Sequence, residues 1–139
     1  MKAVFADSLY WVAIVRPNDQ WSEAARKARQ ELGQVLLVTT DEVLTEFLAA
    51  LSRGGPSLRQ RAVEMVQAIL TSPDVEVVAQ TRDGFMAGLE RYKDREDKNY
   101  SLTDCVSMNV MDARGIREIL TNDHHFEQEG FVVLITGKQ

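Results

Sequence analysis

The alternation of short apolar runs with longer amphipathic segments constrains the fold of this 139-residue chain more than any other feature. Short, continuous apolar runs are typical of strands covered on both faces, whereas apolar residues that recur every 3.6 positions are typical of helices. We therefore expect strands over residues 3–6, 35–38, 75–79, 116–120 and 131–135. We expect helices over residues 8–15, 21–32, 57–70, 81–95 and 102–113, and one that opens at Thr39-Thr40-Asp41-Glu42 and ends near Gly54.

Two of these helices carry more detailed expectations. The Thr39-x-x-Glu42 pattern fits a capping box, in which the two side chains satisfy the first backbone groups of a helix. In the 57–70 helix, the helical period predicts an inward face made of Ala62, Val63, Val66, Ile69 and Leu70.

The order of the elements predicts the fold class. Strands that alternate with helices imply parallel strands joined by crossover helices on both faces, which is the doubly wound α/β architecture. Neither a linker nor a repeat interrupts the pattern, so we expect one domain over residues 1–139. In such sheets, ligands bind at the carboxyl ends of the strands, at the point where strand order reverses.

Composition excludes several classes of protein. A single cysteine rules out a disulfide framework, and no apolar run reaches the ~20 residues that a membrane helix needs. The N-terminal segment carries Asp7 and lacks a small-residue cleavage site, so we expect a cytoplasmic protein without a membrane partner. The net charge of −5 argues against a passive nucleic-acid binder but leaves open an enzyme that acts on nucleic acid through bound cations.

Four acidic residues stand at the ends of the predicted elements. Asp7 follows the first strand, Asp123 follows the fourth, Glu46 lies one turn inside the helix after the second, and Asp104 opens the helix before the fourth. Each has an ordinary structural interpretation. The three aspartates could cap helices, Asp104 as the acidic half of a capping box with Ser101, and Glu46 could lie on a solvated helix flank.

A joint interpretation is that the four carboxylates meet at one rim of the sheet. Carboxylates that close together repel one another unless a cation is present, and hard divalent cations prefer oxygen ligands. Mg²⁺ or Mn²⁺ is therefore the expected occupant. Cys105 has no partner at zinc spacing, and the adjacent His124 and His125 are expected to be ordinary surface or turn residues.

These motifs together resemble the PIN-domain ribonucleases, and within them the VapC-type toxins of toxin–antitoxin pairs. The matching pieces span nearly the whole chain: VFADSLYWVAIV, TTDEVLTEFL, DKNYSLTDCVSM and ILTNDHHFEQEGFVVL. The resemblance implies a five-stranded sheet of order 3-2-1-4-5 and a metal-dependent endoribonuclease. It implies that Asp7, Asp104 and Asp123 hold Mg²⁺ or Mn²⁺ and that Glu46 completes the catalytic pocket. It also implies an RNA substrate, a homodimer and a small antitoxin as partner.

Other interpretations remain open at this stage. The same residues would suit a housekeeping PIN-domain nuclease in RNA processing. A non-catalytic receiver-like signalling module shares the topology and an acidic pocket, but it needs an acid after the third strand, where this chain has Gln80-Thr81, and its late lysine would have to be Lys138, beyond the last strand. Ser8 and Thr121, next to the acids, could each bind a ligand or carboxylate or act as a local cap.

Overall fold

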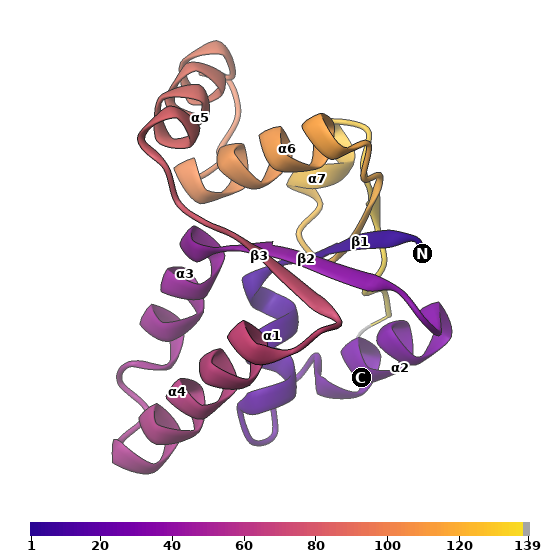
Figure 1. Cartoon of the computed structure of the whole chain (residues 1–139), viewed down its shortest axis with the longest axis vertical. Helices are drawn as coiled ribbons and strands as arrows, with labels where there is room; N and C mark the ends of the chain where they lie inside the picture. Colours follow the sequence, from indigo (N-terminus) through magenta and orange to yellow (C-terminus); the bar gives the residue numbers. More distant parts are fainter. Residues whose placement is uncertain (138–139) are drawn as a thin grey trace.

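Five parallel strands form one sheet in the order β3-β2-β1-β4-β5 (Figure 1). The structure is a computed structural model and describes residues 1–137. The strands are β1 (Ala3–Ala6), β2 (Leu36–Thr40), β3 (Val75–Val78), β4 (Glu118–Leu120) and β5 (Val132–Val133). The predicted fold class and strand order are confirmed. The predicted domain runs to residue 139, and its last two residues, including Lys138, lie outside the described part.

Seven helices within residues 1–137 cover the two faces of the sheet. Figure 1 shows α1 to α4 on one side and α5 to α7 on the other. Their bounds are α1 Ser8–Val15, α2 Ser22–Leu32, α3 Asp41–Leu51, α4 Pro56–Thr71, α5 Arg82–Asp94, α6 Leu102–Arg114 and α7 His125–Gln128. Among residues 1–137, no helix is long and apolar enough to cross a membrane.

The central strand β1 explains where the chain can bind a ligand. It pairs with β2 on one side and with β4 on the other, so Phe5 lies level with both Val38 and Ile119. The connections leave β1 toward opposite edges of the sheet, which makes the carboxyl ends of β1 and β4 the switch point. Fully buried apolar side chains fill both layers beneath that rim: Phe5, Phe47, Met108, Ile119, Leu120 and Phe126.

The start of α3 differs from the predicted capping box. β2 extends to Thr40, and the Thr40 hydroxyl caps the helix by accepting a hydrogen bond from the Val43 amide at 3.0 Å. The Thr39 side chain instead bonds to the neighbouring strand β1, where its hydroxyl donates to the Ala6 carbonyl at 2.9 Å. The capping box of Thr39 and Glu42 is therefore wrong, because the strand continues for two residues beyond its apolar run.

Helix α4 buries a narrower face than its periodicity predicts. Ala62 and Ile69 are buried, but Val63 is 48% exposed and Leu70 is 58% exposed. The helix lies against α3, α1 and the edge strand β3, and within residues 1–137 no further element covers the flank that carries Val63 and Leu70. The prediction that both side chains face inward is wrong for this reason.

The contact between α5 and α6 depends on the missing side chain of Gly88. A Cβ at this position would lie 2.6 Å from the Val106 Cγ2 atom and 3.3 Å from the Leu102 Cδ1 atom. We expect Gly88→Ala to lower the free energy of unfolding by about 1–3 kcal/mol, because overpacking outweighs the helix propensity of alanine. Urea unfolding followed by circular dichroism measures the change. The double variant Gly88→Ala/Val106→Ala should lose less unfolding free energy than the two single variants lose in sum, because the smaller side chain at position 106 makes room for the added methyl group. A Gly88→Ala protein as stable as the wild type would contradict the prediction.

Candidate active site

A cleft of about 530 Å³ opens at the switch point of the sheet, and all four predicted acids line it. Asp7 follows β1, Asp123 follows β4, Glu46 comes from α3 and Asp104 from α6. Side chains that are up to 116 positions apart in the sequence, from position 7 to position 123, thus meet at one rim of the sheet. Their roles in catalysis and metal binding remain proposals.

Asp7 is the most buried of these acids. Its backbone amide donates to the Leu120 carbonyl at 3.2 Å, which ties it to β4, and its Oδ2 atom accepts a hydrogen bond from the Thr121 hydroxyl at 2.8 Å. The Oδ1 atom is buried and has no hydrogen-bond partner within residues 1–137. Although Asp7 occupies the N-cap position of α1, its side chain makes no capping bond. Helix capping therefore does not account for this carboxylate.

The surroundings of Asp7 oppose its negative charge. Burial, with smaller contributions from the Asp104 and Glu46 carboxylates, raises the pKa of the Asp7 carboxyl from 3.8 to about 7, although hydrogen bonds from the Thr121 hydroxyl and the Ser8 backbone act in the opposite direction. A carboxylate without a counter-charge is costly to bury. A bound cation would relieve this cost, which makes Asp7 the strongest electrostatic indication of a metal at the rim.

Glu46 is held across the cleft by Ser8. The Ser8 hydroxyl donates to the Glu46 Oε1 atom at 2.5 Å, so the contact between α1 and α3 includes a bond between two polar side chains. Glu46 is half-buried and faces the cleft, and it does not lie on a freely solvated flank. Of the two hydroxyls singled out in the sequence, Ser8 and Thr121, each binds a carboxylate of the site.

Asp104 serves the fold and faces the cleft at the same time. The predicted capping box is present: the Ser101 hydroxyl accepts a bond from the Asp104 amide, and the Asp104 Oδ2 atom accepts one from the Ser101 amide at 3.1 Å. Burial raises the pKa of the Asp104 carboxyl, the charges of Asp123 and Glu46 raise it as well, and the bonds from Ser101 lower it. Capping and a role in the site are compatible, because the carboxylate still lines the cleft.

Asp123 shapes the turn into α7. Its Oδ1 atom accepts a hydrogen bond from the His125 amide at 2.9 Å, the local bond of an Asx turn. The Asp123 amide in turn donates to the Thr121 hydroxyl at 3.2 Å. The side chain therefore fixes the turn before α7, but the predicted helix cap is wrong, because the N-cap position of α7 is His124 and no side chain makes a capping bond there; about a third of the Asp123 side chain remains exposed.

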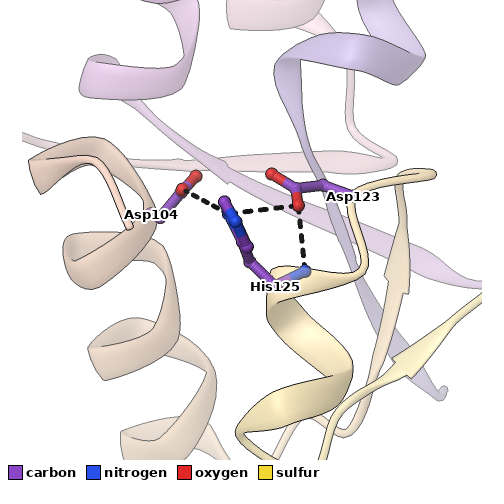
Figure 2. A group of neighbouring side chains, drawn as sticks. All are labelled: Asp104, Asp123 and His125. Carbon is purple, nitrogen blue, oxygen red and sulfur yellow. Dashed lines mark hydrogen bonds and ion pairs between the residues drawn. The ribbon is translucent and has the colours of Figure 1, made fainter. Parts of the chain in front are cut away.

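His125 is a site residue that the sequence analysis placed elsewhere. Its ring lies between two acids, with the Nδ1 atom 3.3 Å from Asp123 Oδ1 and 3.8 Å from Asp104 Oδ2 (Figure 2). His124 behaves as expected, since it is exposed and contacts Glu127 at 2.5 Å. The usable sequence signal was the Asp123-x-His125 spacing, because an Asx turn directs the residue two positions later back toward the aspartate.

The donors fit a divalent cation. One carboxylate oxygen each from Asp104 and Asp123 and one ring nitrogen of His125 lie within 4.8 Å of one another. Within residues 1–137, Asp7 is not part of that group, but its unpaired Oδ1 atom is buried beside the same cleft. Oxygen donors suit Mg²⁺ and Mn²⁺, and imidazole suits first-row transition ions. Asp97, the first residue of the DKNYSLTDCVSM motif, is exposed and is not among the residues that line the cleft.

Comparison with known proteins agrees with this geometry. Residues 4–131 match the PIN domain family. The 23S rRNA-specific endonuclease VapC20 of Mycobacterium tuberculosis, from strains CDC 1551 and H37Rv, is 28% identical over 129 residues, which cover 93% of this chain and 95% of the relative. The crystal structure of M. tuberculosis VapC20, described as a sarcin-ricin loop cleaving toxin, superposes with a TM-score of 0.85 at 26% identity and covers 96% of this chain and 99% of that one. FitAcB from Neisseria gonorrhoeae, at 10% identity and a TM-score of 0.66 over 96% of both chains, shares the fold.

The buried Asp7 carboxyl should make stability depend on pH. The folded state keeps the proton up to about pH 7, whereas the unfolded chain releases it near pH 4. The folded state therefore binds more protons in this window, and stability falls as the pH rises through it. In EDTA, we expect the wild type to lose on the order of 2–3 kcal/mol between pH 4.5 and 7.5 relative to Asp7→Asn. Urea unfolding at both pH values measures this difference.

Asp97→Asn is the matched control, because Asp97 is exposed and lies outside the cleft. It should follow the wild-type dependence on pH. Parallel curves for the wild type and Asp7→Asn would show that the Asp7 carboxyl ionises normally in the folded protein.

Proposed function

The chain belongs to the PIN-domain family, and from that membership we propose that it is a Mg²⁺- or Mn²⁺-dependent endoribonuclease of the VapC toxin type that hydrolyses phosphodiester bonds in RNA. One observation carries the proposal. The carboxylates of Asp7, Glu46, Asp104 and Asp123 line a single cleft at the switch point, and the most buried of them has an oxygen that finds no hydrogen-bond partner in the described part of the chain. Such a pocket favours a divalent cation and, through it, a phosphate.

The residues that line the cleft have two different roles in this proposal. Asp104 and Asp123, with Asp7 beneath them, hold the cation. A cation bound there neutralises the phosphate charge and supplies an activated water. Glu46, fixed by the Ser8 hydroxyl, stands on the α3 side, where its carboxylate can orient the attacking water or accept its proton. This chemistry does not use the ribose 2′-OH, so the preference for RNA comes from contacts outside the reacting phosphate.

Ribosomal RNA is the first substrate to test, because the similar VapC20 is a 23S rRNA-specific endonuclease. The net charge of −5 means that RNA must be held by local cations, since the surface as a whole repels it. Arg16 lines the cleft with a side chain that is 43% exposed, and it is suitably placed to contact a phosphate next to the reacting one.

The proposal includes partners. We expect a homodimer in the cytoplasm and, for a toxin, a small antitoxin that covers it. Trp11 is buried and Trp21 is half-buried, so neither offers a large open surface for a partner. Exposed apolar side chains lie instead on two helices, Val63 and Leu70 on α4 and Met86, Leu89 and Tyr92 on α5.

The alternative functions separate on simple observations. The receiver-like module lacks its phosphate acceptor, because β3 ends at Val78 and Gln80 follows where the acid should stand. A housekeeping nuclease would use the same site, and an adjoining reading frame for a small antitoxin separates that alternative from a toxin.

The carboxylates should be essential for cleavage. We expect Asp7→Asn, Asp104→Asn and Asp123→Asn each to lower the rate of RNA cleavage at least about 100-fold, because each removes charge that holds the cation. Purified protein is incubated with ribosomes or total RNA in Mn²⁺, Mg²⁺ or EDTA, and the cut ends are mapped.

Asp97→Asn should cleave like the wild type, since Asp97 is exposed outside the cleft. Each variant is checked by circular dichroism. Full activity in any of the three variants would remove that residue from the site, and cleavage in EDTA would remove the metal from the mechanism.

The oligomeric state tests the proposed assembly. At micromolar concentration, we expect sedimentation equilibrium to give twice the chain mass of 15.7 kDa. Leu89→Glu on α5 and Val63→Glu on α4 introduce a charge at exposed apolar positions, so whichever lies in the interface should yield monomer without unfolding. A wild-type protein that sediments only as a monomer would refute the homodimer.

A further inference from the structure

We propose that His125 is a direct nitrogen ligand of the cation, and that it shifts the preference of the site from Mg²⁺ toward first-row transition ions. This inference rests on the proposed function but goes beyond it, because an acidic pocket alone would present only oxygen ligands. His125 would supply one imidazole nitrogen to the coordination of the cation.

The position of the imidazole is the first argument. Its Nδ1 atom faces the Asp104 and Asp123 carboxylates at 3.8 and 3.3 Å, distances too long for good hydrogen bonds (Figure 2). The same atom is buried and has no hydrogen-bond partner within residues 1–137. Asp7 lines the same cleft and is only 5% exposed. Its Oδ1 atom also has no hydrogen-bond partner within residues 1–137. Two buried, unsatisfied atoms at one cleft point to a ligand at that cleft, and the His125 Nδ1 atom is the one that lies within 4.8 Å of carboxylate oxygens of both Asp104 and Asp123.

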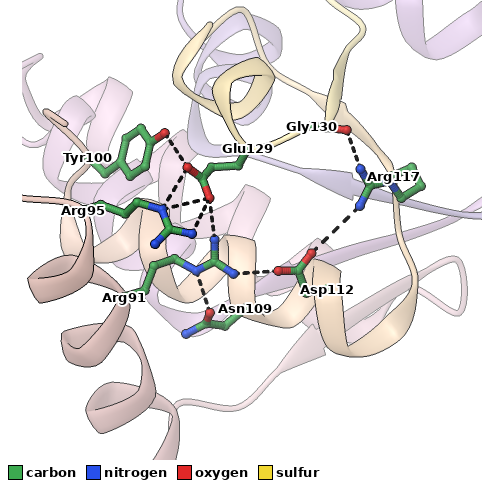
Figure 3. A network of polar contacts seen from close by, with 8 residues as sticks. All are labelled: Arg91, Arg95, Tyr100, Asn109, Asp112, Arg117, Glu129 and Gly130. Carbon is green, nitrogen blue, oxygen red and sulfur yellow. Dashed lines mark hydrogen bonds and ion pairs between the residues drawn. The ribbon is translucent and has the colours of Figure 1, made fainter. Parts of the chain in front are cut away.

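The ring is also held in place from behind. Tyr100 packs edge-on against it, with ring centroids 5.4 Å apart, and the His125 amide is fixed by its bond to Asp123. The Tyr100 hydroxyl donates to Glu129 at 2.9 Å, and Glu129 also accepts bonds from Arg91 and Arg95 (Figure 3).

This support resembles the second layer of contacts around established metal sites. There, partners behind a ligating histidine fix the orientation of its ring, and their loss weakens metal binding. A histidine on an ordinary surface turn would not need such a set of contacts. His124, the residue before it, has none of them and lies in solvent.

The chemistry of the donor predicts selectivity. Mg²⁺ strongly prefers oxygen ligands and retains its waters, whereas imidazole nitrogen suits transition ions. Replacing one oxygen by a nitrogen therefore raises the affinity for Mn²⁺ and the later ions relative to Mg²⁺. A site of carboxylates alone would show the smaller difference expected from oxygen ligands.

Pulsed electron paramagnetic resonance of the Mn²⁺-loaded, tag-free protein tests the ligand directly. We expect ¹⁴N modulation from a coordinated imidazole, and we expect it to change to the ¹⁵N pattern when the protein is labelled with ¹⁵N-histidine. The chain has only two histidines, so His124→Ala should keep the signal and His125→Ala should lose it. Labelling needs no mutation, which keeps the test valid if His125→Ala fails to fold.

Affinity gives a second readout. By titration of Mn²⁺ and Mg²⁺ into the metal-free protein, His125→Ala should raise the Kd for Mn²⁺ about tenfold or more and the Kd for Mg²⁺ less than about threefold. Equal losses for both ions, or bound Mn²⁺ without histidine nitrogen modulation, would overturn the inference. If Mn²⁺ binds without nitrogen and RNA is still cleaved, the nuclease assignment stands and only the ligand assignment fails. If Mn²⁺ does not bind at all, both fail.

Discussion

The pairing of β1 with β4 forces a carboxylate into the interior of the protein, and the site depends on this constraint. The bond from the Asp7 amide to Leu120 continues the sheet by one residue, so the side chain at position 7 emerges beside Thr121 and above the core. The Thr121 hydroxyl donates a hydrogen bond to one oxygen of the Asp7 carboxylate, and the other oxygen has no hydrogen-bond partner within residues 1–137. A carboxylate buried in this way costs several kcal/mol when charged, and only a cation at the rim offsets the cost without a proton.

Two of the four acids hold the local fold together and also face the cleft. Asp104 closes the capping box of α6 and Asp123 closes the turn into α7, and both still face the cleft. The same bonds that begin these helices fix the direction of the carboxylates, so the local fold orients the donors before any ligand arrives. Asp7 and Glu46 differ, because the helix-capping and solvated-flank interpretations do not describe their contacts.

The sequence predicted the elements because they follow from local patterns, and it predicted that the four acids meet at one cleft because the carboxyl ends of parallel strands share one edge of the sheet. The roles of the four acids in catalysis and metal binding stay predictions. It failed where the outcome depends on neighbours that a local pattern does not reveal. The helical period placed Val63 and Leu70 on the inward face of their helix. Both are exposed, because within residues 1–137 no element beyond the edge strand β3 covers them. His125 was missed because adjacency to His124 was judged on regular helix geometry. The Asx turn at Asp123 separates the two rings, leaving His124 in solvent and placing His125 in the cleft. The strand order came from family resemblance, since alternation alone allows several orders.

The charge of the cleft determines the order in which an RNA nuclease of this kind can bind its ligands. Up to four carboxylates face a phosphate backbone, and the chain as a whole carries a net charge of −5. Without a cation, a phosphate near Asp104 and Asp123 would meet repulsion in a partly buried site, where salt screens it poorly. Arg16 lies on the same cleft but is paired with Asp19, which also lines it, at 3.5 Å, so it does not balance the four acids of the site. For the proposed nuclease, the cation would therefore bind before the RNA approaches closely, because the acidic cleft repels a phosphate as long as its charge is not neutralised.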